Sequence, residues 1–354
     1  MKFSRLKFLA IVGIVFNKNS ARKFQFLKCL ALLLASFLVI TACKGTTSVT
    51  PKTDQPPLKV VYSLWAGYFP LVIAQEKGFF EQQGVKVESL YTDSYLNSVS
   101  SFSASKADGL ATTLGSIMSI IGKEPDLQIP LITDESAGAD VVVAQNKIKS
   151  IADLKGKRIA AKVGDFGELL ITHMLQKSNL TTDDVNLLSL EPESVPKRLQ
   201  TGDIQAGHTW FPYTLEATKA GAKILFSSNQ TPGLIPGLFV FRSKVLRDRP
   251  DEIKAFIRGW FQAQDYWQTN PEESKQLIAK KLNLKPEEIS TEGIRLYQLK
   301  DNLAGFTQGS TTASLYHTAK LYSDFFIQKG GLSTAPDIQK LIVPSFVEQL
   351  GKLN

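Results

Sequence analysis

Aromatic and acidic side chains recur in this chain just after short apolar runs that are rich in β-forming residues. In sequence order, the candidates for ligand contact are Trp65, Tyr68, Asp93, Ser116, Asp134, Asp140, Gly164, Phe166, Glu168 and Trp210. Indole and phenol rings can form the walls of a binding site, while carboxylates and hydroxyls supply hydrogen bonds. The set predicts a site that holds a small molecule.

The loop Gly164–Glu168 allows two interpretations. A glycine lets backbone N–H groups approach a ligand closely, but a carboxylate cannot donate to an anion and repels it. Asp165 and Glu168 are expected either to cap a helix or to face the cleft and select a cationic or amide-bearing ligand. Backbone amides together with Ser116 or Thr113 would still allow an anion.

The histidines do not suggest a metal site. The chain has three, His173, His208 and His317, and their positions lack the spacing of metal ligands. The sequence also has no phosphate-binding loop of the G-x-x-x-x-G-K-[ST] kind. We therefore expect neither a metal nor a cofactor, and no catalytic residue.

The N-terminal segment has the composition of an export signal. Basic residues precede the short apolar stretch Ala31–Ala42, an order typical of signal peptides, and the stretch is too short to cross a membrane comfortably. It ends in Ile40-Thr41-Ala42-Cys43, which resembles a bacterial lipobox. We expect 1–42 to be a lipoprotein signal peptide, Cys43 to be acylated and 43–57 to be a flexible tether. The alternative is an uncleaved anchor helix.

The net charge is less informative than it first appears. The formal value is +8 over 354 residues, with 41 basic and 33 acidic side chains. Seven of the basic residues lie in 1–42, which has no acidic residue, so 34 basic residues face 33 acidic ones downstream. A nearly neutral mature chain argues against binding to nucleic acid.

Strand and helix patterns alternate from Leu58 onward. We expect a strand over Lys59–Trp65, a helix over Pro70–Gln83 and a strand over Val85–Tyr91, followed by further alternation and a mostly helical stretch after Pro250. Such alternation predicts an α/β fold with mostly parallel sheets. Ligands of such folds lie beyond the carboxyl ends of the strands, where the candidate residues fall.

Several phrases together resemble one family. They are W-A-G-Y-F-P (65–70), G-F-F-E-Q-Q-G (78–84), D-E-S-A-G-A-D (134–140), I-A-D-L-K-G-K-R-I (151–159) and G-D-I-Q-A-G-H-T-W-F-P-Y (202–213). In this order and spacing they are similar to the nitrate/sulfonate/taurine/thiamine-precursor branch of type II periplasmic binding proteins. The resemblance extends from about Leu58 to Leu350.

The resemblance implies a type II periplasmic-binding-protein fold, with two α/β lobes joined by two crossover strands. We expect lobe 1 at 58–140 plus 244–354 and lobe 2 at 146–237, with crossovers near Val141–Gln145 and Leu238–Ser243. The lobes would close over the ligand by a hinge motion.

The resemblance also implies a function. It suggests a monomeric, lipid-anchored extracytoplasmic receptor that delivers a small nitrogen- or sulfur-containing solute to an ABC permease and its ATPase. Two alternatives remain open: a ligand sensor for a membrane receptor, and a pyrimidine-precursor synthase of the same fold. That enzyme uses a lysine-bound cofactor and a cysteine-rich motif, whereas this chain has only Cys29 and Cys43.

Overall fold

The computed structural model describes residues 55–352. All of these residues belong to one compact unit. The predicted signal peptide, the expected acylation site Cys43 and most of the predicted tether lie outside the described residues. No helix within the described part is long and apolar enough to cross a membrane.

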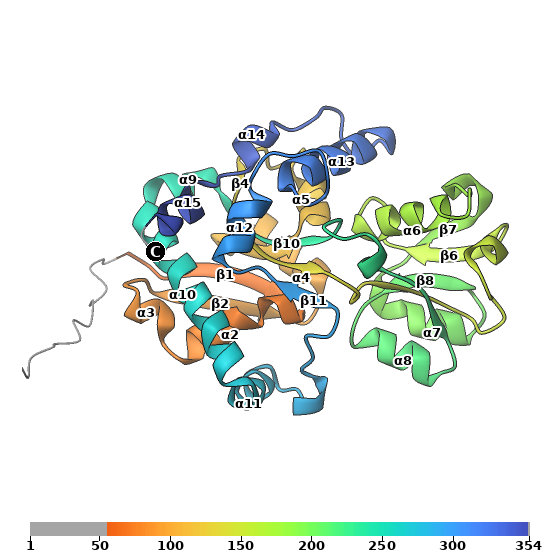
Figure 1. Cartoon of the computed structure of the whole chain (residues 1–354), viewed down its shortest axis with the longest axis horizontal. Coiled ribbons are helices and arrows are strands. Elements are labelled where there is room, and N and C mark those ends of the chain that lie inside the picture. Colours follow the sequence, from red (N-terminus) through yellow and green to blue (C-terminus); the bar gives the residue numbers. More distant parts are fainter. Residues whose placement is uncertain (1–54, 353–354) are drawn as a thin grey trace, which may run out of the picture. The chain divides into compact units, whose positions relative to one another are not determined.

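The described chain contains two β-sheets, each with its own helices (Figure 1). The first has the strand order β11-β4-β10-β3-β1-β2 and the second has the order β7-β6-β8-β5-β9. The strands of the first sheet are β1 (Leu58–Ser63), β2 (Val87–Thr92), β3 (Gly109–Thr113), β4 (Leu127–Ser136), β10 (Pro236–Arg242) and β11 (Ile294–Leu296). Those of the second are β5 (Val141–Ala144), β6 (Arg158–Ala161), β7 (Asn186–Ser189), β8 (Ala206–Thr209) and β9 (Lys223–Ser227).

The α/β class is confirmed, but the sheets are mixed and not mostly parallel. Strand β1 pairs in parallel with β2 and β3, whereas β10 is antiparallel to both β3 and β4. In the second sheet β6 pairs in parallel with β7 and β8, and β5 is antiparallel to β8 and β9. Strands β5 and β10, which follow the two crossings between the sheets, thus run antiparallel to their neighbours. The residue pattern within a single strand does not reveal its direction.

Helices pack on both sheets. They are α2 (Phe69–Glu76), α3 (Phe79–Gln82), α4 (Tyr95–Ser103), α5 (Leu114–Ile120), α6 (Phe166–Gln176), α7 (Val195–Gln200), α8 (Tyr213–Lys219), α9 (Ser243–Asp248), α10 (Pro250–Thr269), α11 (Pro271–Leu282), α12 (Leu299–Gly305), α13 (Leu315–Gln328), α14 (Ile338–Leu341) and α15 (Ser345–Gly351). The helix expected over Pro70–Gln83 is divided into α2 and α3. Gly78 between them has φ of +69°, which interrupts a right-handed helix.

Two short segments carry the chain between the sheets. They span residues 137–140 and 228–235, and so lie just before β5 and just before β10 instead of at Val141–Gln145 and Leu238–Ser243. They are bonded to each other: the Gly138 N–H donates to the Ser228 hydroxyl at 2.8 Å, and the Ser228 N–H donates to the Asp140 carbonyl at 2.9 Å. We refer below to the part built on the first sheet as lobe 1 and the part built on the second as lobe 2.

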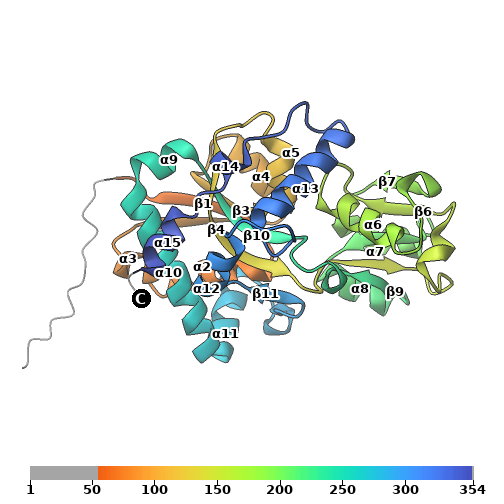
Figure 2. The same ribbon diagram turned by 45° about the horizontal axis from the view of Figure 1, so that its top comes forward.

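Helix α13 of lobe 1 lies beside α5 (Figure 2). Helix α5 in turn packs against α6 of lobe 2. The two lobes therefore meet through helices as well as through the two linking segments.

Candidate ligand-binding site

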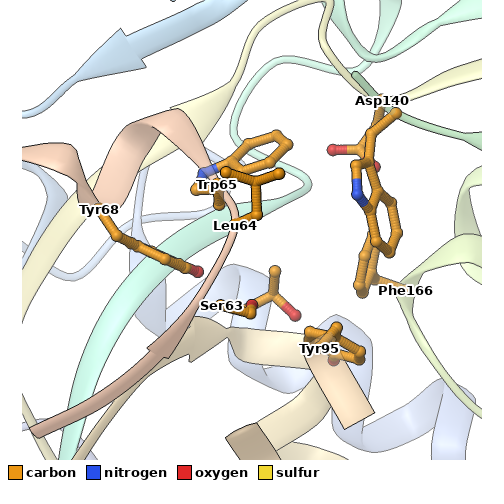
Figure 3. Close-up of a pocket in the computed structure, with 9 residues that line it drawn as sticks. Ser63, Leu64, Trp65, Tyr68, Tyr95, Asp140 and Phe166 are labelled. Atoms are coloured by element: carbon orange, nitrogen blue, oxygen red, sulfur yellow. The ribbon is translucent and has the colours of Figure 1, made fainter. Parts of the chain in front are cut away.

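A small pocket lies where the lobes meet. Nine residues line it: Ser63, Leu64, Trp65, Tyr68, Tyr95, Thr113, Asp140, Phe166 and Trp210 (Figure 3). Its volume is about 30 Å³, close to the space of one water molecule in the liquid. A larger ligand therefore requires the lobes to move apart, or the side chains to rearrange.

The wall of the pocket in lobe 1 follows strand β1. Trp65 comes directly after this strand, and Tyr68 ends the single helical turn Ala66–Tyr68. The Trp65 indole Nε1–H donates to Asp134 Oδ1 at 2.8 Å, and the Thr133 hydroxyl donates to Asp134 Oδ2 at 2.7 Å. Asp134 is fully buried and fixes the orientation of the Trp65 ring.

Burial also affects the ionisation of Asp134. Loss of hydration raises the pKa of its carboxyl to about 7, despite the hydrogen bonds from Thr133 and Trp65, which lower it. The neighbouring carboxylates of Asp140 and Glu135 raise the pKa further. Asp134 therefore titrates close to neutral pH.

The wall in lobe 2 is a cluster of rings. The Phe166 and Trp210 rings stack with centroids 5.9 Å apart, and His208 lies 5.6 Å from Trp210. The His208 Nε2 atom is 2.8 Å from Asp140 Oδ1, and both side chains are buried. The His208 Nδ1 atom is buried with no hydrogen-bond partner among the described residues.

Two polar contacts join the lobes beside the pocket. The Tyr95 hydroxyl of lobe 1 donates to Asp165 Oδ2 of lobe 2 at 3.0 Å. Lys329, just after α13, pairs with Glu168 of α6 at 2.9 Å. Burial raises the pKa of Asp165 to about 6, although the hydrogen bonds from the Phe166 amide and the Tyr95 hydroxyl lower it.

The Gly164–Glu168 loop forms a helix cap. The Asp165 carboxylate accepts a bond from the Phe166 N–H at 2.7 Å, and Glu168 Oε2 accepts one from the Gly164 N–H at 2.8 Å. Glu168 is buried and its other oxygen meets Lys329. The Gly164 N–H is thus engaged within the protein, and neither Gly164 nor Glu168 lines the pocket.

The structure brings together half of the predicted ligand-contact residues. Trp65, Tyr68, Asp140, Phe166 and Trp210 line the pocket. Asp134 lies behind Trp65, while Ser116 is buried in the first turn of α5 with its hydroxyl 3.0 Å from Thr113 Oγ1. Asp93 is exposed and bonds to Asn97. A ligand role for all of these residues stays a prediction.

Sequence reasoning left Ser63, Leu64, Tyr95 and Thr113 out of the predicted set, although they line the pocket. Tyr95 begins α4 immediately after β2, and Ser94 caps that helix by accepting from the Asn97 N–H at 3.1 Å. An aromatic residue that follows closely after a strand is the signal that Trp65 also carries, so it could have identified Tyr95.

Comparison with known proteins agrees with this architecture. A family model described as NMT1/THI5 like matches residues 65–274. A Brucella abortus protein named as a binding protein is 28% identical over 248 residues, which cover 68% of this chain and 76% of the relative. A Bacillus subtilis protein named as an aliphatic sulfonates-binding protein is 28% identical over 262 residues, covering 71% and 77%.

A solved structure shows the same fold. The crystal structure of the periplasmic aliphatic sulphonate binding protein SsuA from Escherichia coli matches with a TM-score of 0.67 and 17% identity, over 82% of this chain and 92% of that chain. Two lobes, paired linking segments and a pocket between them define the class of periplasmic solute-binding proteins. Within that class, the chain belongs to the NMT1/THI5-like family.

Proposed function

We propose that this protein is the extracytoplasmic solute-binding component of an ABC importer and holds a small nitrogen- or sulfur-containing molecule between its lobes. The observation that carries the proposal is the aromatic pocket, to which both lobes contribute and which lies beside both linking segments. A ligand in this position stabilises the closed arrangement of the lobes, and a permease can recognise that arrangement. Asp140 belongs to a linking segment and also lines the pocket, so it couples ligand contact to the hinge.

The proposal includes membrane attachment through a lipid on Cys43, with the folded part outside the cytoplasm. The lipobox-like residues Ile40–Cys43 support this attachment, and relatives that are periplasmic binding proteins support the compartment. The partners are then a small solute, a permease with its ATPase, and the membrane surface.

An enzyme is a weaker proposal for this chain. None of the nine described residues that line the pocket is a lysine or a cysteine. A synthase that forms a covalent bond between a lysine and its cofactor needs a lysine amine at its site. Relatives named as binding proteins also favour a receptor.

The test is to capture the ligand and then measure its transport. The full chain, purified in mild detergent, is incubated with a bacterial metabolite extract, separated from free solutes and denatured, and the released molecules are identified by mass spectrometry. We expect one solute to be retained unchanged, and retention to fall in Trp210→Ala but not in Leu188→Ala, which alters an exposed side chain of the same lobe.

The outcome also separates the alternatives. Deletion of the gene should abolish uptake of the retained solute by the cell. Uptake that continues while a transcriptional response is lost would indicate a sensor. A chemically converted solute would indicate an enzyme, and retention of no solute would contradict the binding function.

A further inference from the structure

The charges around the pocket are unusual for a protein whose relatives are named for binding sulfonates. Among the described residues that line the pocket, Asp140 carries the only charge. Asp134 lies behind Trp65, and Asp165 lies against Tyr95. Three buried carboxyl groups therefore surround a space that no described lysine or arginine lines.

Basic side chains nearby are already paired. Lys329 meets the buried Glu168 at 2.9 Å. Arg295 meets Glu135 at 3.2 Å and Asp301 at 2.8 Å. His208 is paired in the same way, with its Nε2 atom 2.8 Å from Asp140 Oδ1, and it does not line the pocket.

The helix starts around the pocket offer little to an anion. A free helix N-terminus attracts an anion through unpaired N–H groups. Here the Ser116 N–H of α5 is directed to Thr113 Oγ1, and the Phe166 N–H of α6 to the Asp165 carboxylate. The Gly164 N–H is directed to Glu168. The protein's own side chains, two of them negatively charged when ionised, occupy the donors that an anion would use.

One buried polar group is aimed into the pocket without a partner. Tyr68 is 3% exposed, and within residues 55–352 its hydroxyl forms no hydrogen bond with another side chain or the backbone. Figure 3 shows this hydroxyl and the Asp140 carboxylate pointing into the pocket from different sides. A group with N–H donors placed between them would satisfy both oxygen atoms.

We propose that the pocket selects a small organic cation, an ammonium or amidinium group, whose N–H groups donate to Asp140 and Tyr68 while the faces of Trp65, Trp210 and Phe166 surround its carbon skeleton. Aromatic rings attract a cation through their quadrupole, and Asp140 supplies a carboxylate on the described lining of the pocket with which a cation can pair. This inference rests on the proposed binding function and specifies its ligand class.

The test uses ligands matched in size and shape. The full chain, purified in mild detergent, is titrated with benzylammonium, benzamidinium, ethylammonium and tetramethylammonium, and with phenylmethanesulfonate, benzoate, ethanesulfonate and nitrate. Thermal shift and isothermal calorimetry report binding. We expect stabilisation by at least one cation and by none of the anions.

A variant tests whether Asp140 binds the positive charge of the ligand. Asp140→Asn keeps an oxygen for the His208 Nε2–H and removes only the charge, so affinity for the cation should fall by about 30-fold or more. Asp265→Asn removes one negative charge from an exposed site on α10 and should leave the affinity unchanged. The neutral ligand benzyl alcohol should bind wild type and Asp140→Asn equally.

Other results would overturn the inference. Stabilisation by an anion, equal stabilisation by both classes, or no stabilisation by any cation would each contradict cation selection. Equal changes of cation affinity in Asp140→Asn and Asp265→Asn would show that Asp140 does not bind the positive charge of the ligand. Binding of an anion would leave the solute-binding function standing, whereas failure to retain any solute from the metabolite extract would refute the function itself.

Discussion

At the scale of single residues, Asp134 positions an indole ring and carries an ionisation that depends on its burial. It accepts from the Trp65 Nε1–H and the Thr133 hydroxyl while fully buried. Because burial removes the hydration that stabilises its charge, the pKa of the Asp134 carboxyl is raised from its ordinary value of 3.8 to about 7. Because the folded protein holds this proton more tightly than the unfolded chain, stability falls as the pH rises from about 4 to about 7.

Asp134→Asn should remove this dependence. Its amide keeps an oxygen for Trp65 and can donate to Thr133, and it carries no charge at any pH. At pH 5 the variant should be modestly more stable than the wild type, because folded Asp134 is then protonated while the unfolded chain already carries the charge. At pH 8 folded Asp134 is ionised as well, so the variant's advantage should exceed that at pH 5 by roughly 2–3 kcal/mol. Urea denaturation at both pH values measures the difference.

Asp265→Asn is the control for this experiment, since it changes an exposed carboxylate and should give no such gap. Asp165, whose pKa is also raised, is present in both proteins and cancels in the comparison. A gap of the same size at pH 5 and pH 8 would contradict the assignment of the raised pKa to Asp134.

At the scale of elements, the linking segment 228–235 is held by α13 and by the chain just before it. The Thr312 hydroxyl donates to the Pro232 carbonyl at 2.7 Å, and the Thr318 hydroxyl donates to the Gly233 carbonyl at 3.3 Å. Gly233 has φ of +71°, and a Cβ atom there would lie 2.1 Å from the Thr312 carbonyl oxygen. Glycine at this position lets the linking segment approach residue 312 closely.

Gly233→Ala should destabilise the protein more than Gly221→Ala does. Both replacements force alanine into a left-handed conformation, which costs about 1–2 kcal/mol. Gly221 has φ of +90° and open space around its Cβ position, so strain of the backbone is its only penalty. Gly233→Ala adds a collision with backbone and should cost at least about 1 kcal/mol more. Chemical denaturation measures the free energy of unfolding of both variants. Equal losses of stability would show that segment 311–313 shifts to accommodate the added methyl group without cost.

At the scale of the whole molecule, the lobes are joined by contacts between residues far apart in the chain. Tyr95 meets Asp165, and Lys329 meets Glu168. These contacts form only when the lobes come together, so they contribute to the closed arrangement that a ligand would favour. The proposed attachment to the membrane is a separate matter, and it rests on the leader sequence.

Cys43→Ser should release the protein from the membrane. Without its thiol the chain has no atom on which to carry the lipid, so the protein should move to the soluble fraction and lose incorporation of labelled fatty acid. Cys29→Ser changes the only other cysteine and should remain membrane-bound and labelled. If Cys43→Ser were retained with an intact leader, the anchor would be a helix and not a lipid.

The sequence by itself determined the α/β class, the family and part of the pocket, because these depend on local pattern. Strand runs, helix periodicity and the order of short motifs are all visible along the chain, and aromatic residues that follow strands fall at the ligand edge. Trp65, Tyr68 and Trp210 could therefore be predicted to lie near one another. The division of Pro70–Gln83 at Gly78 was less accessible, since a glycine can also lie within a continuous helix.

The tertiary structure alone decided the directions of the strands and the partners of the polar groups. Strands β5 and β10 run against their neighbours because of how the chain crosses between lobes, and β11 is a three-residue edge strand with too few residues to show a period. The same loop gave Asp165, Phe166 and Glu168 different surroundings. Glu168 forms an ion pair with Lys329, Phe166 lines the pocket, and Asp165 accepts a hydrogen bond from the Tyr95 hydroxyl. The sequence gives the type of each ionisable side chain, but its hydration and its partner depend on residues that only folding brings together.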